Sequence, residues 1–256
     1  MRAYVVAVMA LGSTACVGTA GGDLFEFDAV AVGAAQAEDG TYSFESGRGF
    51  DVTLTQARVH VGAVYLNQAV ATSVSSDTSC TLAGIYVAEV TSGLDVDALS
   101  RDWQPFPVRG HATADHAPTG EVWLTGGDIN EEADPTVILD VAGTAQREDA
   151  EYPFEGELTI GTHRIVVPPN PALPGAKPIC KQRVVSPIRT DITPREGGTL
   201  VLHIDPAGMF GNVDFTTLEP GPDGIYRFAD DASNQASDNL YSGLRASAGV
   251  YSFSWE

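Results

Sequence analysis

Short runs of alternating apolar and polar residues, separated by Gly-, Pro- and Asp-rich turns, constrain the fold of this 256-residue chain more than any other feature. Alternation at period 2 is typical of strands that bury one face. We predict strands at residues 24–30, 42–44, 50–61, 84–90, 121–124, 136–141, 154–160, 181–188, 199–205, 225–228 and 249–255. Many short strands with turn punctuation indicate an all-β fold, and we expect an antiparallel β-sandwich with at most one or two short helices.

The segment 50–61 contains a change of parity. Its apolar residues alternate up to Leu54 and then shift to Ala57, Val59 and Val61. Such a shift predicts a bulge, or a bend between two sheets, and it turns Arg58 and His60 away from the core.

Helical signals are few. Residues 97–100 and 232–244 each have room for a turn or two, and Gly243 is a plausible C-terminal stop for the second. A proline-rich connector spans residues 167–178, and the flanking segments 158–167 and 181–188 are expected to pair across it. We therefore expect a single β-sandwich domain over 25–256 rather than two domains joined by a linker.

The N-terminal residues have the layout of an export signal. Arg2 is followed by the short apolar run 3–11, then by small residues and Cys16. The run is far shorter than the roughly 20 residues needed to span a bilayer. We predict a signal peptide over 1–15 and a tether over 16–24. The alternatives are ordinary secretion after cleavage near Ala15 or Ala20, and an N-terminal strand with an incidental cysteine.

Residues 13–16, Ser-Thr-Ala-Cys, resemble the lipobox of bacterial lipoproteins, although Ser13 replaces the usual large aliphatic residue. The resemblance implies that Cys16 is the lipid attachment site and the mature N-terminus. Several acyl chains on one residue would form a durable membrane anchor. Val17 after the cysteine implies, by the same resemblance, an outer-membrane lipoprotein facing the periplasm or the cell surface.

The charge balance excludes some partners. The chain has 14 basic and 34 acidic residues, a net charge of −20. Nucleic-acid binding requires a basic footprint, so we expect no nucleic-acid partner. Binding to anionic lipid is also disfavoured, so membrane attachment would have to come through Cys16.

The chain has three cysteines. If Cys16 carries lipid, Cys80 and Cys180 remain as a pair, and an even number in an oxidising compartment predicts a disulfide. Two isolated thiols are the alternative.

Histidines are the main candidates for metal binding. His111 and His116 flank Asp115 within six positions, and His60 and His203 lie in predicted strands. Imidazole suits copper and zinc, so we predict a site for copper or another divalent metal from these four residues. The alternative is that they are unrelated surface and strand histidines.

A family resemblance points in the same direction. Residues 49–54, 64–66 and 251–255 resemble segments of uncharacterised all-β bacterial lipoproteins and, more distantly, of methanobactin-associated copper-binding periplasmic proteins. This resemblance implies a β-rich fold and copper binding through histidines. It assigns no particular histidine of this chain as a ligand.

Calcium is a second, less favoured cofactor. Asp128, Asn130, Glu132 and Asp134 alternate oxygen ligands like the start of an EF-hand loop, but the required glycine and the final glutamate are missing. A second acidic cluster contains Asp230, Asp231, Asn234 and Asp238. The alternative for both clusters is a solvated turn.

Enzyme signatures are absent from the sequence: it has no Gly-x-Ser-x-Gly, no His-Glu-x-x-His and no P-loop. We therefore predict a non-enzymatic, lipid-anchored binding or structural module of the cell envelope, with copper as the first candidate ligand. The rival is a module that binds a carbohydrate or a protein partner through aromatic residues, unless these simply pack in the fold. The candidate aromatic residues are Tyr65, Tyr86, Trp103, Trp123 and Trp255.

Overall fold

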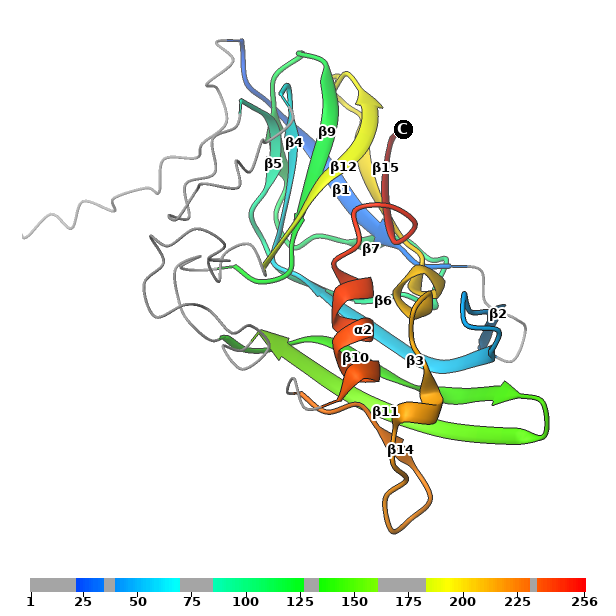
Figure 1. The fold of residues 1–256 in the computed structure, drawn as a ribbon. Coiled ribbons are helices and arrows are strands. Elements are labelled where there is room, and N and C mark those ends of the chain that lie inside the picture. Colours follow the sequence, from blue (N-terminus) through cyan, green and yellow to red (C-terminus); the bar gives the residue numbers. More distant parts are fainter. Residues whose placement is uncertain (1–21, 35–39, 70–84, 127–133, 161–182, 231–233) are drawn as a thin grey trace, which may run out of the picture.

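The fold is known from a computed structural model, which describes residues 22–34, 40–69, 85–126, 134–160, 183–230 and 234–256. Two β-sheets dominate these residues (Figure 1). The larger sheet contains β1 (Phe25–Val32), β4 (Ala63–Asn67), β5 (Tyr86–Val90), β7 (Gln104–Pro105), β8 (Gly110–Ala112), β9 (Ala117–Trp123), β12 (Val184–Ile192), β13 (Thr199–Ile204) and β15 (Tyr251–Trp255). The smaller contains β2 (Tyr42–Glu45), β3 (Asp51–Val61), β6 (Leu94–Asp97), β10 (Asp134–Arg147), β11 (Ala150–Ile160) and β14 (Tyr226–Arg227).

The nine-stranded sheet curls nearly into a barrel. Its strand order is β12-β9-β4-β5-β8-β1-β13-β15, with β7 paired to β1, and the two outermost strands, β12 and β15, contact each other. Gly120 of β9 packs against the ring of Phe253 from β15 across the interior. Because Gly120 has no side chain, the large ring fills the space inside the curled sheet.

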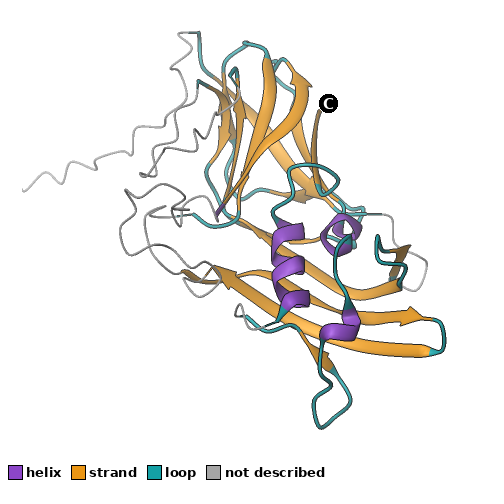
Figure 2. Cartoon of the chain, in the orientation of Figure 1, coloured by secondary structure: helices purple, strands orange, loops and turns teal. Residues whose placement is uncertain are grey.

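The six-stranded sheet has the order β14-β11-β10-β3-β2, with β6 paired to β3. The helix α2 (Gln235–Leu244) and the short 3-10 helices η2 (Pro206–Phe210) and η3 (Phe215–Thr217) lie over one face (Figure 2). Phe154 of β11 packs on η2 and η3, with its ring centroid 5.7 Å from that of Phe210 and 5.0 Å from that of Phe215. One contiguous apolar core runs through both sheets and these helices.

The parity change in β3 is confirmed. The register with β10 shifts between Leu54 and Gln56, which leaves one extra residue on β3. The chain then passes at Gly62 from β3 in the smaller sheet to β4 in the larger one. Both expected features, a bulge and a bend between sheets, therefore occur in one segment, and Arg58 is exposed while His60 is partly buried.

The all-β prediction is confirmed. The two sheets are mostly antiparallel, the larger one curls nearly into a barrel, and the pairs β1–β13 and β11–β14 are parallel.

The expected pairing of the segments that flank the proline-rich connector is wrong. Strand β11 forms a hairpin with β10 through the two-residue turn 148–149, whereas β12 pairs with β9 in the other sheet. The hairpin with β10 already provides hydrogen-bond partners for one edge of β11. A two-residue connection favours this pairing of neighbouring strands. The connector itself lies outside the described residues.

The helix expected within residues 232–244 is α2, which spans Gln235–Leu244. The side chain of Asn234 accepts a hydrogen bond from the Ser237 amide at the N-terminus. Gly243 does not stop the helix, because the last helical residue is Leu244 and the C-cap is Arg245. Residues 98–99 form a turn rather than a helix.

Among the described residues, none of the helices has the length and apolar character needed to cross a bilayer.

Candidate functional site

Three of the four candidate metal histidines have partners of their own. His60 Nδ1 lies 2.6 Å from Asp95 Oδ1 on the neighbouring β6, and His116 Nε2 lies 2.8 Å from Asp191 Oδ1 of β12. His203 Nε2 lies 2.9 Å from Ser254 Oγ of β15. His111 is exposed on β8, between Glu26 of β1 and Glu89 of β5 in the register.

These histidines do not converge in the described residues. His60 belongs to the smaller sheet, and the other three to the larger one or its loops. Along β1, His111 is opposite Glu26 and His203 is opposite Val32, so about 20 Å of strand separates their positions. No group of three or more His, Cys, Asp or Glu side chains suited to a metal occurs within the described ranges. Copper binding by these residues stays a prediction, which metal analysis of His111→Ala and His116→Ala variants would test.

The oxygen-rich clusters have structural roles where they are described. Asp134 forms an ion pair with Arg183, Asn234 caps α2, and Asp230 accepts hydrogen bonds from the amide and hydroxyl of Thr159. Asp238 lies in the first turn of α2. Asp128, Asn130, Glu132 and Asp231 lie outside the described residues, as do Cys16, Cys80 and Cys180. The calcium, lipid and disulfide predictions are therefore not tested by this structure.

Three of the five candidate aromatic residues lie together on the larger sheet. The ring of Tyr65 is 5.0 Å from Trp123 and 5.1 Å from Tyr86, measured between centroids. The other two lie elsewhere: Trp255 packs on Phe27 at 5.0 Å, and Trp103 is 55% exposed in the loop before β7.

Polar residues surround these rings because of strand register. Tyr65 is directly opposite Glu89 of β5 on one side and Glu121 of β9 on the other, and Asn67 is opposite Thr119. Directly opposite residues of antiparallel strands share a face, and Val64, Leu66 and Val122 point to the other face, into the core. We call this side of the sheet the polar–aromatic face, which comprises Tyr65, Asn67, Tyr86, Glu89, Thr119, Glu121, Trp123 and Ser186.

Glu121 is the central carboxyl group of this face. Its residue is 0% exposed, and its two oxygens accept hydrogen bonds of 3.2 Å from Trp123 Nε1 and from Ser186 Oγ. Burial raises the pKa of Glu121, and these two hydrogen bonds together with the nearby Asn67 only partly oppose that rise. A buried carboxyl group with a raised pKa is typical of a ligand or reaction site.

Asn67 and Thr119 are buried, and their side chains lack hydrogen bonds of normal geometry to the described residues. Asn67 is 0% exposed, and neither its Nδ2 nor its Oδ1 has a hydrogen-bond partner of normal geometry in the described part of the chain. Thr119 Oγ1, on the opposite strand β9, is also buried and has no hydrogen-bond partner in the described part of the chain. Buried polar groups are almost always paired, so these two mark a place where a polar partner is needed.

Sequence reasoning proposed the rings but missed their polar neighbours. The signal was present: Tyr65 and Asn67, and Glu121 and Trp123, alternate with apolar residues at period 2, so each pair shares a face. The pairing of β4 with β9, which unites the two pairs, is a long-range contact that the sequence does not display.

Comparison with known proteins gives no further identification. No protein-family model, curated protein or solved structure matches this chain. The candidate site therefore rests on its own geometry.

Proposed function

We propose that this chain is an exported binding protein, held at the cell envelope through a lipid on Cys16, which binds a saccharide on its polar–aromatic face. The observation that carries the saccharide proposal is the buried amide of Asn67, which lies beside the Glu121 carboxyl group but makes no hydrogen bond of normal geometry among the described residues. An unpaired buried amide costs free energy, and a ligand that pairs with it would recover that cost on binding.

Saccharide chemistry fits the residues of this face. A sugar hydroxyl both donates and accepts hydrogen bonds, so it can pair with the amide of Asn67, the hydroxyl of Thr119 and the carboxyl group of Glu121. The rings of Tyr65 and Trp123 are partly exposed and offer apolar surfaces beside these groups. Ligand sites typically combine aromatic walls with a few such convergent polar groups.

The variant Asn67→Leu separates a binding role from a structural one. Leucine has a similar size and no polar atoms, so removal of the unpaired amide should raise the free energy of unfolding of the ligand-free protein by about 1–3 kcal/mol. The same change should abolish saccharide binding. A glycan array with the mature chain would identify the saccharide, and calorimetry with that saccharide would compare the variants.

A matched pair of tryptophan variants supplies the control. Trp123→Ala removes a ring of the polar–aromatic face and should lose binding, whereas Trp103→Ala removes an exposed ring elsewhere and should keep it. The saccharide proposal fails if the array shows no bound glycan. It also fails if Asn67→Leu destabilises the protein and leaves binding intact.

The anchor has a separate test. Cys16→Ser should release the protein from the membrane fraction, because the chain's net charge of −20 gives it no attraction for anionic lipid. A mature protein that stays in the membrane fraction without acyl mass on Cys16 would contradict the proposed anchor.

A further inference from the structure

An arginine lies at the edge of the polar–aromatic face. In β12, Arg189 is opposite Thr119 of β9, which is in turn opposite Asn67 of β4. The three residues therefore form one row across three strands on the same face. Two interstrand spacings, about 10 Å, separate Arg189 from Asn67.

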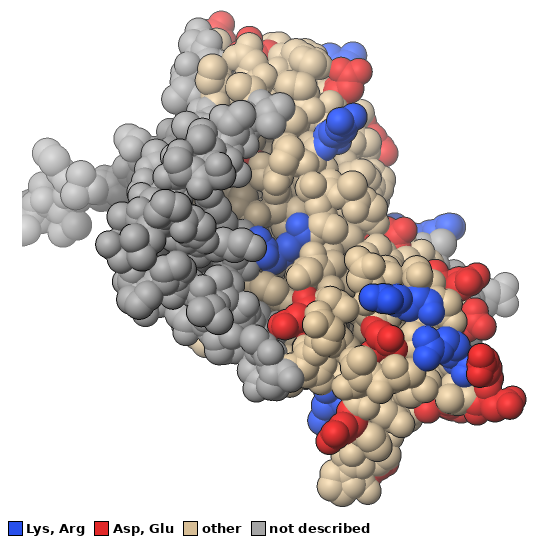
Figure 3. Space-filling model, viewed as in Figure 1, with Lys and Arg blue, Asp and Glu red and all other residues tan. Residues whose placement is uncertain are grey.

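Within the described part of the chain, the guanidinium of Arg189 has no charged partner. Arg109, Arg183 and Arg227 each form ion pairs with carboxylates, but Arg189 is exposed and makes no hydrogen bond or ion pair within the described residues. On the side drawn in Figure 3, charged side chains of both signs are visible over both sheets, and they are most numerous at the lower right, over the smaller sheet.

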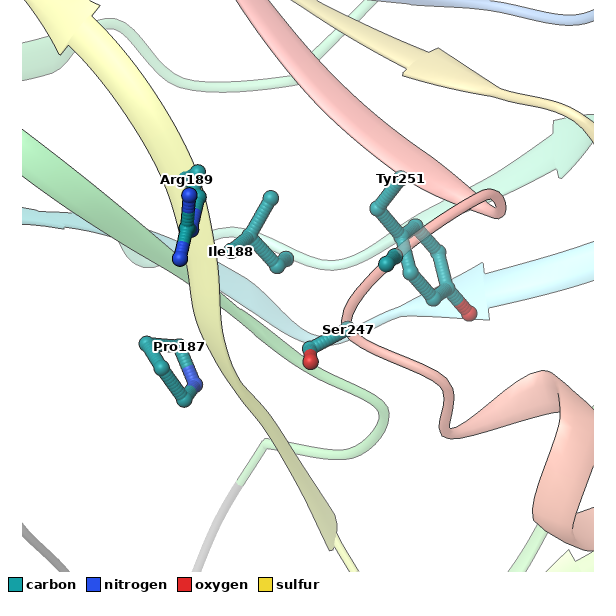
Figure 4. Close-up of a pocket in the computed structure, with 6 residues that line it drawn as sticks. Pro187, Ile188, Arg189, Ser247 and Tyr251 are labelled. Atoms are coloured by element: carbon teal, nitrogen blue, oxygen red, sulfur yellow. The ribbon is translucent and has the colours of Figure 1, made fainter.

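Arg189 also lines a small pocket at the seam where β12 meets β15. The pocket has a volume of about 220 Å³ and is lined by Pro187, Ile188, Arg189, Ser247, Ala248 and Tyr251. Figure 4 shows Pro187 and Arg189 along β12 on one side, with Ser247 and the ring of Tyr251 on the other. The pocket is smaller than the roughly 300–1,000 Å³ that drug-sized ligands occupy, so it suits a single substituent of a larger ligand.

We propose that the ligand of this protein is an acidic saccharide, and that the seam pocket with Arg189 and Ser247 is the subsite for its carboxylate. The inference rests on the proposed saccharide function and adds the class of saccharide. A guanidinium presents two parallel N–H donors that match a carboxylate, and the Ser247 hydroxyl supplies another donor across the pocket. The remainder of the ligand lies along the row toward Asn67.

The net negative charge of the protein repels an acidic ligand at long range. At about 0.15 M salt, however, charges more than ~8 Å apart are largely screened, so the contact with Arg189 dominates. The discriminating measurement is calorimetry of the mature full-length protein at this salt concentration. Three probes are compared: an oligogalacturonate, its neutral methyl ester and the corresponding neutral oligogalactose.

We expect the oligogalacturonate to bind at least about tenfold more tightly than its methyl ester, the range of a charge-assisted hydrogen bond. Arg189→Gln should weaken oligogalacturonate binding to the level of the ester and leave ester binding unchanged. Arg195→Gln removes another exposed arginine, outside the pocket, and should change neither. Ala248→Trp fills the pocket from an exposed position and should have the same effect as Arg189→Gln.

The outcomes separate this inference from the function on which it rests. If the neutral probes bind as tightly as the oligogalacturonate, or if Arg189→Gln leaves oligogalacturonate binding unchanged, the acidic subsite is overturned while saccharide binding stands. If none of the three probes binds, and the glycan array shows no other bound saccharide, both proposals are overturned.

Discussion

Arg183 and Asp134 form an ion pair that joins the two sheets. Arg183 Nη1 lies 2.8 Å from Asp134 Oδ2 and 3.0 Å from Thr125 Oγ1. Arg183 directly precedes β12 of the larger sheet, and Asp134 begins β10 of the smaller one. The Arg183 side chain is 0% exposed and that of Asp134 is 11% exposed, so neither charge is well solvated. The same arginine lies five and six residues before two lining residues of the seam pocket, Ile188 and Arg189.

Arg183→Met should lower the free energy of unfolding by about 3–5 kcal/mol at pH 7, because it leaves the Asp134 carboxylate buried without its partner. Urea unfolding would measure the change. The double variant Arg183→Met, Asp134→Leu removes both charges and should recover most of the loss. Arg195→Met, at an exposed position, should stay within about 0.5 kcal/mol of the wild type. An equal loss in the single and double variants would contradict the ion-pair explanation.

The pH dependence of Glu121 has the opposite sign to that of most carboxylates. Burial raises its pKa above the ordinary value of 4.5. Between the unfolded and folded pKa values, the folded state therefore binds more protons than the unfolded state, and stability falls as pH rises. Glu121→Gln should be more stable than the wild type above the raised pKa and lose this advantage below about pH 4.5. Urea unfolding of both proteins from pH 4 to pH 8 would measure how the difference in their free energies of unfolding changes with pH. A constant difference over this range would contradict the raised pKa of Glu121.

Tyr42 should titrate late. Its hydroxyl donates a hydrogen bond of 3.1 Å to Asp205, and burial together with the charge of Asp205 raises its pKa to about 12. Because the folded pKa exceeds the unfolded value of 10.0, the stability that this contact contributes is present below pH 10 and lost as pH rises through 12. Tyr42→Phe should cost about 0.5–1 kcal/mol at pH 7, since the bond is largely exposed. In an ultraviolet titration, Tyr42→Phe should lack one late-titrating phenol of the wild type. If the variant lacks an early-titrating phenol instead, this assignment is contradicted.

Much of the fold could be predicted from local sequence, whereas the candidate site could not. Period-2 alternation located the strands, and the parity change near Gln56 located the bulge in β3, because both signals involve residues close in the chain. The pairing of β12 with β9 joins segments about sixty residues apart, for example Val185 with Val122, and alternation says nothing about which strands become neighbours. The expected pairing across the proline-rich connector was wrong for this reason.

The same limit applies to the site residues. Histidines were predicted as site residues because imidazole binds metal ions. Those that the structure describes lie apart from one another, and three of them contact separate partners. Asn67 and Glu121 have ordinary residue types for a strand and became conspicuous only when the β4–β9 register placed them together and buried them. Burial and pairing decide which polar residue matters, and both are properties of tertiary structure.

Gly243 supplies the last prediction, and it reverses the usual rule for glycine in a helix. Replacing an exposed helical glycine by alanine normally stabilises by about 1 kcal/mol. A Cβ at Gly243, however, would lie 2.0 Å from the backbone oxygen of Met209, because α2 packs closely on η2. Gly243→Ala should therefore lower the free energy of unfolding by about 1–3 kcal/mol. Ser242→Ala, exposed on the same turn, is the control and should stay within about 0.5 kcal/mol of the wild type. If thermal and urea unfolding show Gly243→Ala to be stabilising, the close contact between α2 and η2 is not as described.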